Sequence, residues 1–180
     1  MGWVLVGWVL VVIATAAAGS AAAALTVEVS SRDGGLFIEA HASGPGSPKG
    51  ALRMLMDFAM LTDYMPNVDS SYVVGRTDSS TLVQQVVTSR FILPWMFRFT
   101  LEFMAHEGGL RFRQDQGSMR DYWGSWRVAE HMEGVEIVYA AQVHTRWRLP
   151  FFYMSYVVRR QVAQMMPALM EELAQREVGE

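Results

Sequence analysis

The sequence predicts an α+β domain: a curved antiparallel sheet of about six or seven strands wrapped around a long C-terminal helix, with two short helices after the first strand. Two observations predict this fold class. Apolar and polar residues alternate between Val68 and about Thr145, as in strands with one buried face. Beyond Pro150 the apolar residues recur every three or four positions, as in an amphipathic helix. One helix laid on such a sheet buries both apolar surfaces.

The composition is that of one globular domain that follows an apolar N-terminal segment. The chain has 180 residues, of which 51% are hydrophobic, and its formal net charge is −3. All 15 basic and 18 acidic residues follow Ala24. This mildly acidic balance argues against nucleic acid as a partner. The absence of cysteine excludes a disulfide framework.

Residues 1–24 have the character of a targeting segment. An uncharged apolar run to Ile13 grades into small residues, and Ala22-Ala23-Ala24 provides a cleavage site of the A-x-A type. The segment lacks Lys and Arg, and its length approaches the roughly 20 residues that span a bilayer, so an uncleaved N-terminal anchor is the alternative. We expect residues 25–180 to form a binding domain that is exported to the periplasm. The alternative is that residues 1–24 attach this domain to the membrane.

The first elements after the leader are predicted as extended chain. Residues 25–43 contain two short alternating runs joined by Asp33-Gly34-Gly35, which indicates a hairpin or the start of a strand. The loop "GPGSPKG" follows, with Ser47 placed to cap a helix and Pro48 in its first turn, where a missing N–H costs nothing.

Two short helices are predicted next. Apolar residues from Ala51 to Phe58 have helical spacing. A second helix should end near Tyr64-Met65-Pro66, because proline disfavours helical geometry in the residue before it.

The predicted sheet occupies the middle of the chain. Its clearest strand is "WMFRFTLEF" at 95–103, in which the aromatic residues and Leu101 share one face and Arg98 lies on the other. Turn sequences at 75–78, 108–109, 117 and 133–134 separate the strands of an antiparallel meander. The segment 70–90 alternates poorly.

The last element is a long amphipathic helix. Its apolar stripe consists of Met154, Val158, Val162, Met165, Leu169 and Leu173. We expect Pro167 to bend or break this helix, since proline removes one backbone hydrogen bond. A helix on a curved sheet can leave a cavity between the two.

Three segments, in this order, are similar to those of a known family. "MLMDFAMLTDYMPNV" (54–68) resembles its Leu-x-Asp-aromatic-x-x-Leu-x-x-aromatic-x-Pro helical stretch, "YWGSWRVAE" (122–130) its Gly-x-Trp strand, and "RWRLPFFYMSYVVRRQV" (146–162) its Pro-started C-terminal helix. The chain after the leader thus resembles the START-like helix-grip superfamily of polyketide cyclases and lipid transport proteins, and within it the coenzyme Q-binding type.

The resemblance implies a cavity for a hydrophobic ligand, in a family that includes lipid and quinone carriers, cyclases and hydrolase-like enzymes. Fold alone does not decide among these activities. We interpret the chain as a binding or transport protein for a lipid, quinone or sterol-like molecule, with no cofactor and with the helical segment 51–66 as a gate. The first alternative is a cyclase or aromatase-like enzyme acting on a polyketide or similar apolar substrate. Its candidate polar groups are Asp57, Arg90, Asp121 and His41. The second alternative is an interaction module tethered by an uncleaved leader.

The inward aromatic and methionine residues have two interpretations. They either fill the core or line a cavity, for which the 13 methionines suit a ligand of variable shape. Under the cavity interpretation, the expected ligand-binding residues are Leu55, Phe58, Leu61, Tyr64, Trp95, Phe97, Phe99, Leu101, Phe112, Trp126, Tyr139, Met154, Val158 and Met165.

No catalytic or metal-binding residue is predicted from motifs. Asp57 and Asp63 could act as an acid–base pair, but we expect Asp57 to be structural and to bind nearby backbone N–H groups or an arginine. The histidines at 41, 106, 131 and 144 lack ligand spacing, and "HEGGL" is not H-E-x-x-H. No G-x-S-x-G motif surrounds any serine.

Basic and aromatic residues gather where the last strand leads into the final helix. Such a cluster can rest on a membrane, with rings among the headgroups and cations against anionic lipid, or it is simply a basic strand end. The expected transient membrane contact consists of Arg146, Trp147, Arg148, Phe151 and Phe152.

Overall fold

The structure is a computed structural model that describes residues 24–89, 95–146 and 150–179. These residues form an eight-stranded antiparallel sheet and three helices. The elements are β1 (Ala24–Arg32), β2 (Gly35–Gly44), α1 (Pro48–Leu55), α2 (Leu61–Tyr64), β3 (Val68–Arg76), β4 (Thr81–Ser89), β5 (Trp95–His106), β6 (Gly109–Gly117), β7 (Asp121–His131), β8 (Gly134–His144) and α3 (Phe151–Gly179).

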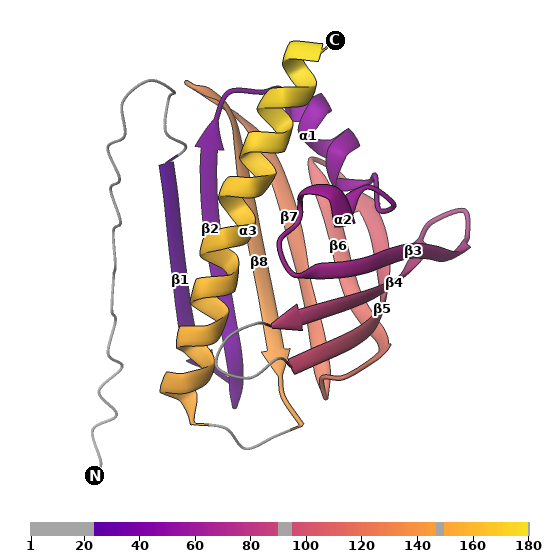
Figure 1. The fold of residues 1–180 in the computed structure, drawn as a ribbon, viewed down its shortest axis with the longest axis vertical. Coiled ribbons are helices and arrows are strands. Elements are labelled where there is room, and N and C mark those ends of the chain that lie inside the picture. Colours follow the sequence, from indigo (N-terminus) through magenta and orange to yellow (C-terminus); the bar gives the residue numbers. More distant parts are fainter. Residues whose placement is uncertain (1–23, 90–94, 147–149, 180) are drawn as a thin grey trace.

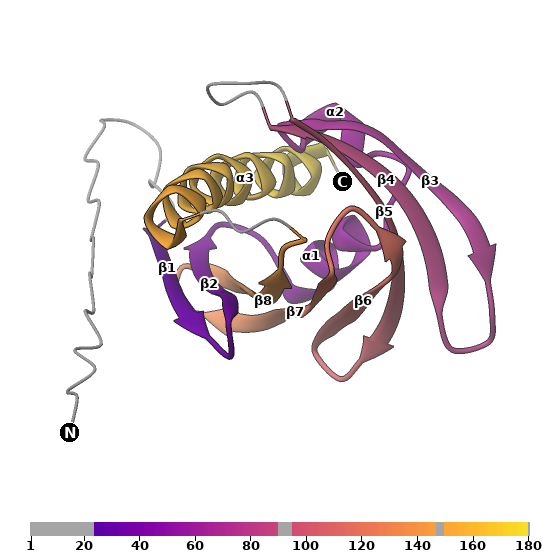
Figure 2. The same cartoon turned by 90° about the horizontal axis from the view of Figure 1, so that it is seen from below.

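The sheet has the strand order β1-β2-β8-β7-β6-β5-β4-β3. Strands β3 to β8 form a meander, and β2 pairs with β8, so the N-terminal hairpin is added to the end of that meander. The sheet curls around α3, and β3 to β5 rise opposite β1 and β2 (Figure 2). Helix α3 crosses the concave face and packs against β1 and β2 (Figure 1). The predicted helix-grip architecture is confirmed.

The N-terminal hairpin accounts for the difference in strand number. Asp33 and Gly34 form its two-residue turn, both with positive φ (51° and 74°), as the right-handed twist of a tight hairpin favours. Both runs of 25–43 are therefore strands. The sheet has eight strands where six or seven were predicted, and the two short helices follow the second strand, not the first.

The short helices begin and end at the predicted signals. The Ser47 hydroxyl oxygen accepts a hydrogen bond from the backbone N–H of Gly50 (3.1 Å), and Pro48 is the first residue of α1. Helix α2 is a single turn, and Met65 is extended just before Pro66. The Glu177 carboxylate accepts a hydrogen bond from the backbone N–H of Ser47 (3.0 Å), which joins the end of α3 to the start of α1.

Helix α3 continues through Pro167 for 29 residues, so the break considered from the sequence is absent. Pro167 is exposed, where the neighbouring backbone groups can bind water in place of the missing bond. The buried stripe lies in the second half of the helix and comprises Val162, Met166, Leu169, Met170 and Leu173.

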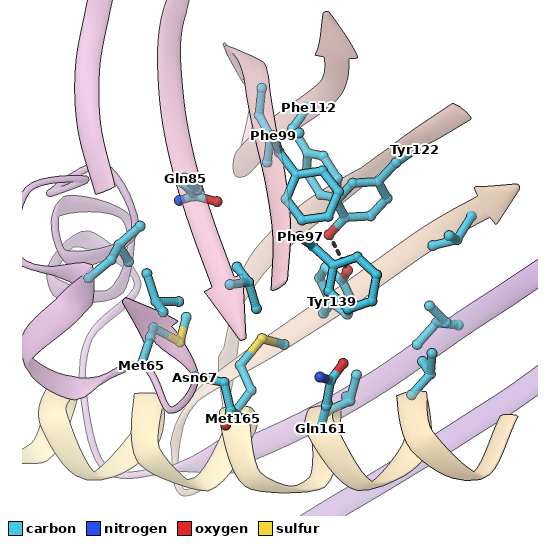
Figure 3. A pocket seen from close by; sticks show the side chains of 18 of the residues that line it. Met65, Asn67, Gln85, Phe97, Phe99, Phe112, Tyr122, Tyr139, Gln161 and Met165 are labelled. Atoms are coloured by element: carbon cyan, nitrogen blue, oxygen red, sulfur yellow. Dashed lines mark hydrogen bonds between the residues drawn. The ribbon is translucent and has the colours of Figure 1, made fainter. Parts of the chain in front are cut away.

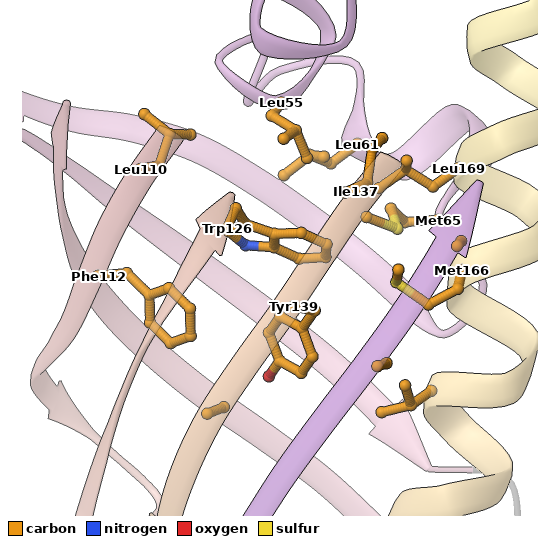
Figure 4. Packing of buried hydrophobic residues seen from close by; sticks show 14 of the residues in the cluster. Leu55, Leu61, Met65, Leu110, Phe112, Trp126, Ile137, Tyr139, Met166 and Leu169 are labelled. Carbon is orange, nitrogen blue, oxygen red and sulfur yellow. The ribbon is translucent and has the colours of Figure 1, made fainter. Parts of the chain in front are cut away.

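The packing under α3 differs between its two halves. Beneath the second half, Met166 and Leu169 are 0% exposed and lie close to Ile137 of β8 (Figure 4). In the first half, Met154 and Val158 are only partly buried. The solid core therefore occupies one end of the concave face and leaves the other end open to a cavity.

Gly124 explains the Gly-x-Trp pattern of β7. It lies opposite Phe112 of β6 and Ala141 of β8. A Cβ atom at Gly124 would overlap the backbone oxygen of Ala140 in β8 and would also lie 2.7 Å from Cζ of Phe112, closer than carbon atoms approach. Two residues later, the Trp126 ring packs on Tyr139 with centroids 4.6 Å apart. Gly124 thus leaves room for the Phe112 ring, and Trp126 covers the Tyr139 ring.

Replacing Gly124 by alanine should destabilise the protein by roughly 1–3 kcal/mol, because Phe112 has to move within a packed wall. Urea unfolding measures this change. The matched control is Gly75→Ala in β3, where the nearest atom to an added Cβ is a Leu82 methyl carbon at 3.5 Å. That control should be nearly neutral. Equal effects of the two substitutions would contradict the packing role of Gly124.

Candidate ligand-binding cavity

A cavity of about 230 Å³ lies between the first half of α3 and the concave face of the sheet (Figure 3). This volume is slightly below the usual range for small-molecule sites, about 300–1,000 Å³. Its wall is formed by Ile38, Leu55, Phe58, Leu61, Met65, Pro66, Asn67, Val68, Gln85, Val87, Phe97, Phe99, Leu101, Phe103, Phe112, Met119, Tyr122, Trp126, Tyr139, Val143, Met154, Val157, Val158, Gln161, Val162 and Met165.

All the residues predicted to bind ligand line this cavity except Tyr64 and Trp95. The Tyr64 hydroxyl donates to the backbone oxygen of Met54 (3.3 Å), and its ring lies under the Arg176 guanidinium. Trp95 is the first residue of β5, and its ring lies beside Phe97 with centroids 6.5 Å apart. Both residues are therefore placed outside the cavity wall. For the others, contact with a ligand stays a prediction.

The cavity wall is apolar apart from a few neutral polar side chains. Among the residues that the structure describes, no Asp, Glu, His, Lys or Arg lines it. The polar members are Asn67, Gln85, Tyr122, Tyr139 and Gln161. An uncharged wall of this kind suits a hydrophobic guest with little or no formal charge.

Sequence reasoning missed the two glutamines, although a signal was present. Gln85 continues the inward alternation of β4 between Val83 and Val87, in the segment where that alternation is weakest. Gln161 falls between Val158 and Met165 on the apolar side of α3. A polar residue on a predicted apolar face indicates a site, and here both such residues line the cavity.

Tyr122 and Tyr139 form a hydrogen-bonded pair on the wall. Their hydroxyl oxygens are 2.8 Å apart (Figure 3). Burial raises the pKa of both phenols, and in Tyr122 the bond to Tyr139 opposes this only in part. Both side chains are therefore neutral at physiological pH. They can donate and accept hydrogen bonds, but they do not supply a phenolate base.

Asp57 fastens the short helices to α3. Its Oδ2 accepts a hydrogen bond from Nη1 of Arg176 (3.2 Å), and Nε of Arg176 donates to Glu172 (2.7 Å). The expected structural role of Asp57 is confirmed. Asp63 accepts from the Thr62 hydroxyl (3.2 Å), and neither acid lines the cavity, so the two do not form a catalytic pair there.

Of the other polar candidates for an enzyme, His41 and Asp121 lie off the cavity wall. His41 sits on the opposite face of the sheet, hydrogen-bonded to Glu39 (3.0 Å) and Glu136 (3.1 Å). Burial alone would lower the pKa of His41, but these two bonds raise it overall. Asp121 lies 4.0 Å from His144, and Arg90 lies outside the described residues. Within the described ranges, no group of acidic and histidine side chains could hold a metal ion.

The expected membrane-contact residues are only partly described. Phe151 and Phe152 are 46% and 74% exposed at the start of α3. Nε of Arg146 donates to the backbone oxygen of Met119 (3.2 Å). Trp147 and Arg148 lie outside the described residues. None of the described helices combines the length and apolar character needed to cross a membrane.

Comparison with known proteins identifies the family. Residues 45–170 match the model of the family described as polyketide cyclase / dehydrase and lipid transport. This match covers most of the chain, and the chain belongs to that family. A comparison with curated protein sequences finds no match.

Solved structures share the fold at low sequence identity. A STAR-related lipid transfer protein from Xanthomonas axonopodis is 18% identical, with a TM-score of 0.69 over 93% of this chain and 99% of that one. The Zhui aromatase/cyclase from Streptomyces is 14% identical, with a TM-score of 0.67 over 78% and 94%. Human StAR-related lipid transfer protein 5 is 10% identical, with a TM-score of 0.66 over 96% and 89%. At these identities the likeness shows the fold alone.

Proposed function

We propose that this member of the polyketide cyclase / dehydrase and lipid transport family binds a lipid, quinone or sterol-like molecule in its cavity and carries or presents it outside the cytoplasm. The apolar, uncharged cavity wall is the observation that carries the proposal. Each square ångström of apolar surface that leaves water contributes about 25 cal/mol, so such a wall retains a hydrophobic guest. Two of the solved structures with this fold are STAR-related lipid transfer proteins by title.

The segment 51–66 acts as the gate of the cavity. Leu55, Phe58 and Leu61 line the inner wall, and the Phe58 ring packs on Phe103 with centroids 4.6 Å apart. The ion pair between Asp57 and Arg176 holds this segment to α3 and is partly exposed to solvent. A solvated pair of this kind contributes little stability, so opening the gate costs mainly the apolar contacts.

The rim of the cavity supports entry from one side. Pro66, Val87 and Phe97 line the cavity and are only partly buried, as are the α3 residues Val157 and Met165. We infer an opening at these residues, between α3 and strands β3 to β5. Phe151 and Phe152 belong to the same half of α3 and are exposed. We infer that these rings rest on a membrane while the guest enters.

A cyclase or aromatase-like enzyme is the second candidate, favoured by the Tyr122–Tyr139 pair on the cavity wall. Two neutral hydroxyls can polarise a carbonyl group, although they cannot remove a proton as a phenolate would. The two functions differ in outcome: a carrier returns its guest chemically unchanged, whereas an enzyme converts it.

Export rests on the sequence of the leader, most of which lies outside the described residues. We propose cleavage after Ala24, at the first residue of β1. Intact mass measurement of the protein from its own host, after separation of membrane and soluble fractions, should find a chain that begins at Leu25. A full-length chain in the membrane fraction would indicate the anchor instead. A full-length chain in the cytosol would contradict export.

Filling the cavity should abolish binding of a neutral hydrophobic probe such as N-phenyl-1-naphthylamine. In Val158→Phe the added ring occupies the cavity, and affinity should fall about tenfold or more, which corresponds to at least 1.4 kcal/mol. Fluorescence titration measures the affinity. The matched control is Gln164→Phe on the exposed side of α3, which should bind as the parent protein does. Equal affinities in all three proteins would place the probe outside this cavity.

The membrane contact predicts binding to vesicles that depends on the exposed rings. Replacing both Phe151 and Phe152 by serine should weaken binding to vesicles of mixed neutral and anionic lipid by about tenfold, because each ring loses apolar burial. Vesicle co-sedimentation measures this. Met132→Ser, which removes a 99% exposed residue between β7 and β8, should have no effect. Unchanged vesicle binding by the double variant would show that the two rings are not part of the membrane contact.

A further inference from the structure

The cavity wall holds an amide donor without a partner. Nε2 of Gln161 is buried and makes no hydrogen bond. Gln161 lies on α3 and lines the cavity, where Figure 3 draws its amide end among the other wall side chains. An unsatisfied buried donor costs about 1–3 kcal/mol, and folded proteins keep few of them. A guest that accepts this hydrogen bond would remove the cost.

The tyrosine pair adds a second unused donor. Tyr122 and Tyr139 share one hydrogen bond, in which one hydroxyl donates and the other accepts. The proton of the accepting hydroxyl is left over, because among the described residues the pair has no third partner. Gln85 differs from these groups, since its Nε2 already donates to the Ser71 hydroxyl (3.4 Å). Two donors on the wall therefore lack a partner among the described residues: Nε2 of Gln161 and one hydroxyl proton of the tyrosine pair.

The charge of the wall limits which acceptor fits. No cationic side chain of the described residues lines the cavity, so a carboxylate or phosphate would be buried without a counter-charge. Burial raises the pKa of both tyrosines, so neither becomes an anion that would attract a cationic guest. A neutral oxygen acceptor on an apolar body satisfies the free donors at no cost in buried charge.

We propose that the cavity selects neutral apolar molecules that carry a carbonyl oxygen, as a ketone, quinone or ester does, and that Gln161 or the Tyr122–Tyr139 pair donates a hydrogen bond to this oxygen. The inference rests on the proposed function and deepens it. It names the recognised chemical group and separates such guests from free fatty acids and from pure hydrocarbons.

Three probes of similar size test the selection. They are 2-acetylnaphthalene, which carries a neutral carbonyl, 2-ethylnaphthalene, which lacks oxygen, and 2-naphthoate, which is anionic. Calorimetric titration of the parent protein should give the tightest binding for the acetyl compound, by about fivefold over the ethyl compound, as one net hydrogen bond predicts. The naphthoate should bind most weakly.

Variants assign the preference to the named donors. Gln161→Leu keeps the size of the side chain and removes its donor, so the acetyl-to-ethyl preference should fall toward one while ethylnaphthalene still binds. Replacing both Tyr122 and Tyr139 by phenylalanine removes the spare hydroxyl proton, so it should reduce the preference as well, and this double variant serves if the first variant fails to fold. Gln164→Leu, on the exposed side of α3, is the matched control and should keep the full preference.

The outcomes separate this inference from the function on which it rests. If acetyl and ethyl compounds bind equally to the parent protein, or if Gln161→Leu and the double tyrosine variant both keep the preference, the carbonyl selection is wrong and the hydrophobic cavity stands. Tightest binding of naphthoate overturns the neutral-guest argument in the same way. If no probe binds, the proposed function and this inference fail together.

Discussion

Helix α3 is packed tightly at one end of a concave sheet and borders a cavity at the other. Its second half buries Met166 and Leu169 completely. The end of the helix is also joined to the short helices, through Arg176 to Asp57 and through Glu177 to Ser47. With that end fixed, the curl of β3 to β5 determines how much space remains under the first half. The cavity and the proposed gate both depend on this unequal packing.

The cavity wall combines apolar surface with a few neutral donors, and the two have separate effects. The apolar surface retains any guest that prefers it to water. We propose that the hydroxyl pair of Tyr122 and Tyr139 and the amide of Gln161 select between guests of similar size, because a buried donor left without a partner costs more than a paired donor gains. The ionisable groups Asp57 and His41 lie away from the cavity. Asp57 joins the segment of α1 and α2 to α3, and His41 lies on the far face of the sheet.

The periodicity of apolar residues was sufficient to predict the elements that bury one uniformly apolar face. The alternation of β5 and the stripe of α3 predicted both the helix-grip architecture and most of the cavity wall. The N-terminal hairpin was harder, since the turn at Asp33-Gly34 indicated either a hairpin or one strand, and pairing of β2 with β8 is a long-range contact that no local pattern encodes. Tyr64 and Trp95 were predicted to line the cavity as aromatic residues, but the Tyr64 ring lies under the Arg176 guanidinium, and Trp95, at the start of β5, does not line the cavity. Gln161 was missed because a polar residue on an apolar stripe was not counted as part of a site.

The most direct measurement of the central claim is native mass spectrometry of the protein purified from its own host, followed by extraction and identification of what it carries. The account predicts a bound species of one chemical class, apolar and uncharged, that leaves when the fold is opened and is absent from Val158→Phe prepared in the same way. A protein that is free of ligand in repeated preparations, or the same species on the blocked variant, would contradict a cavity that holds a guest beneath α3.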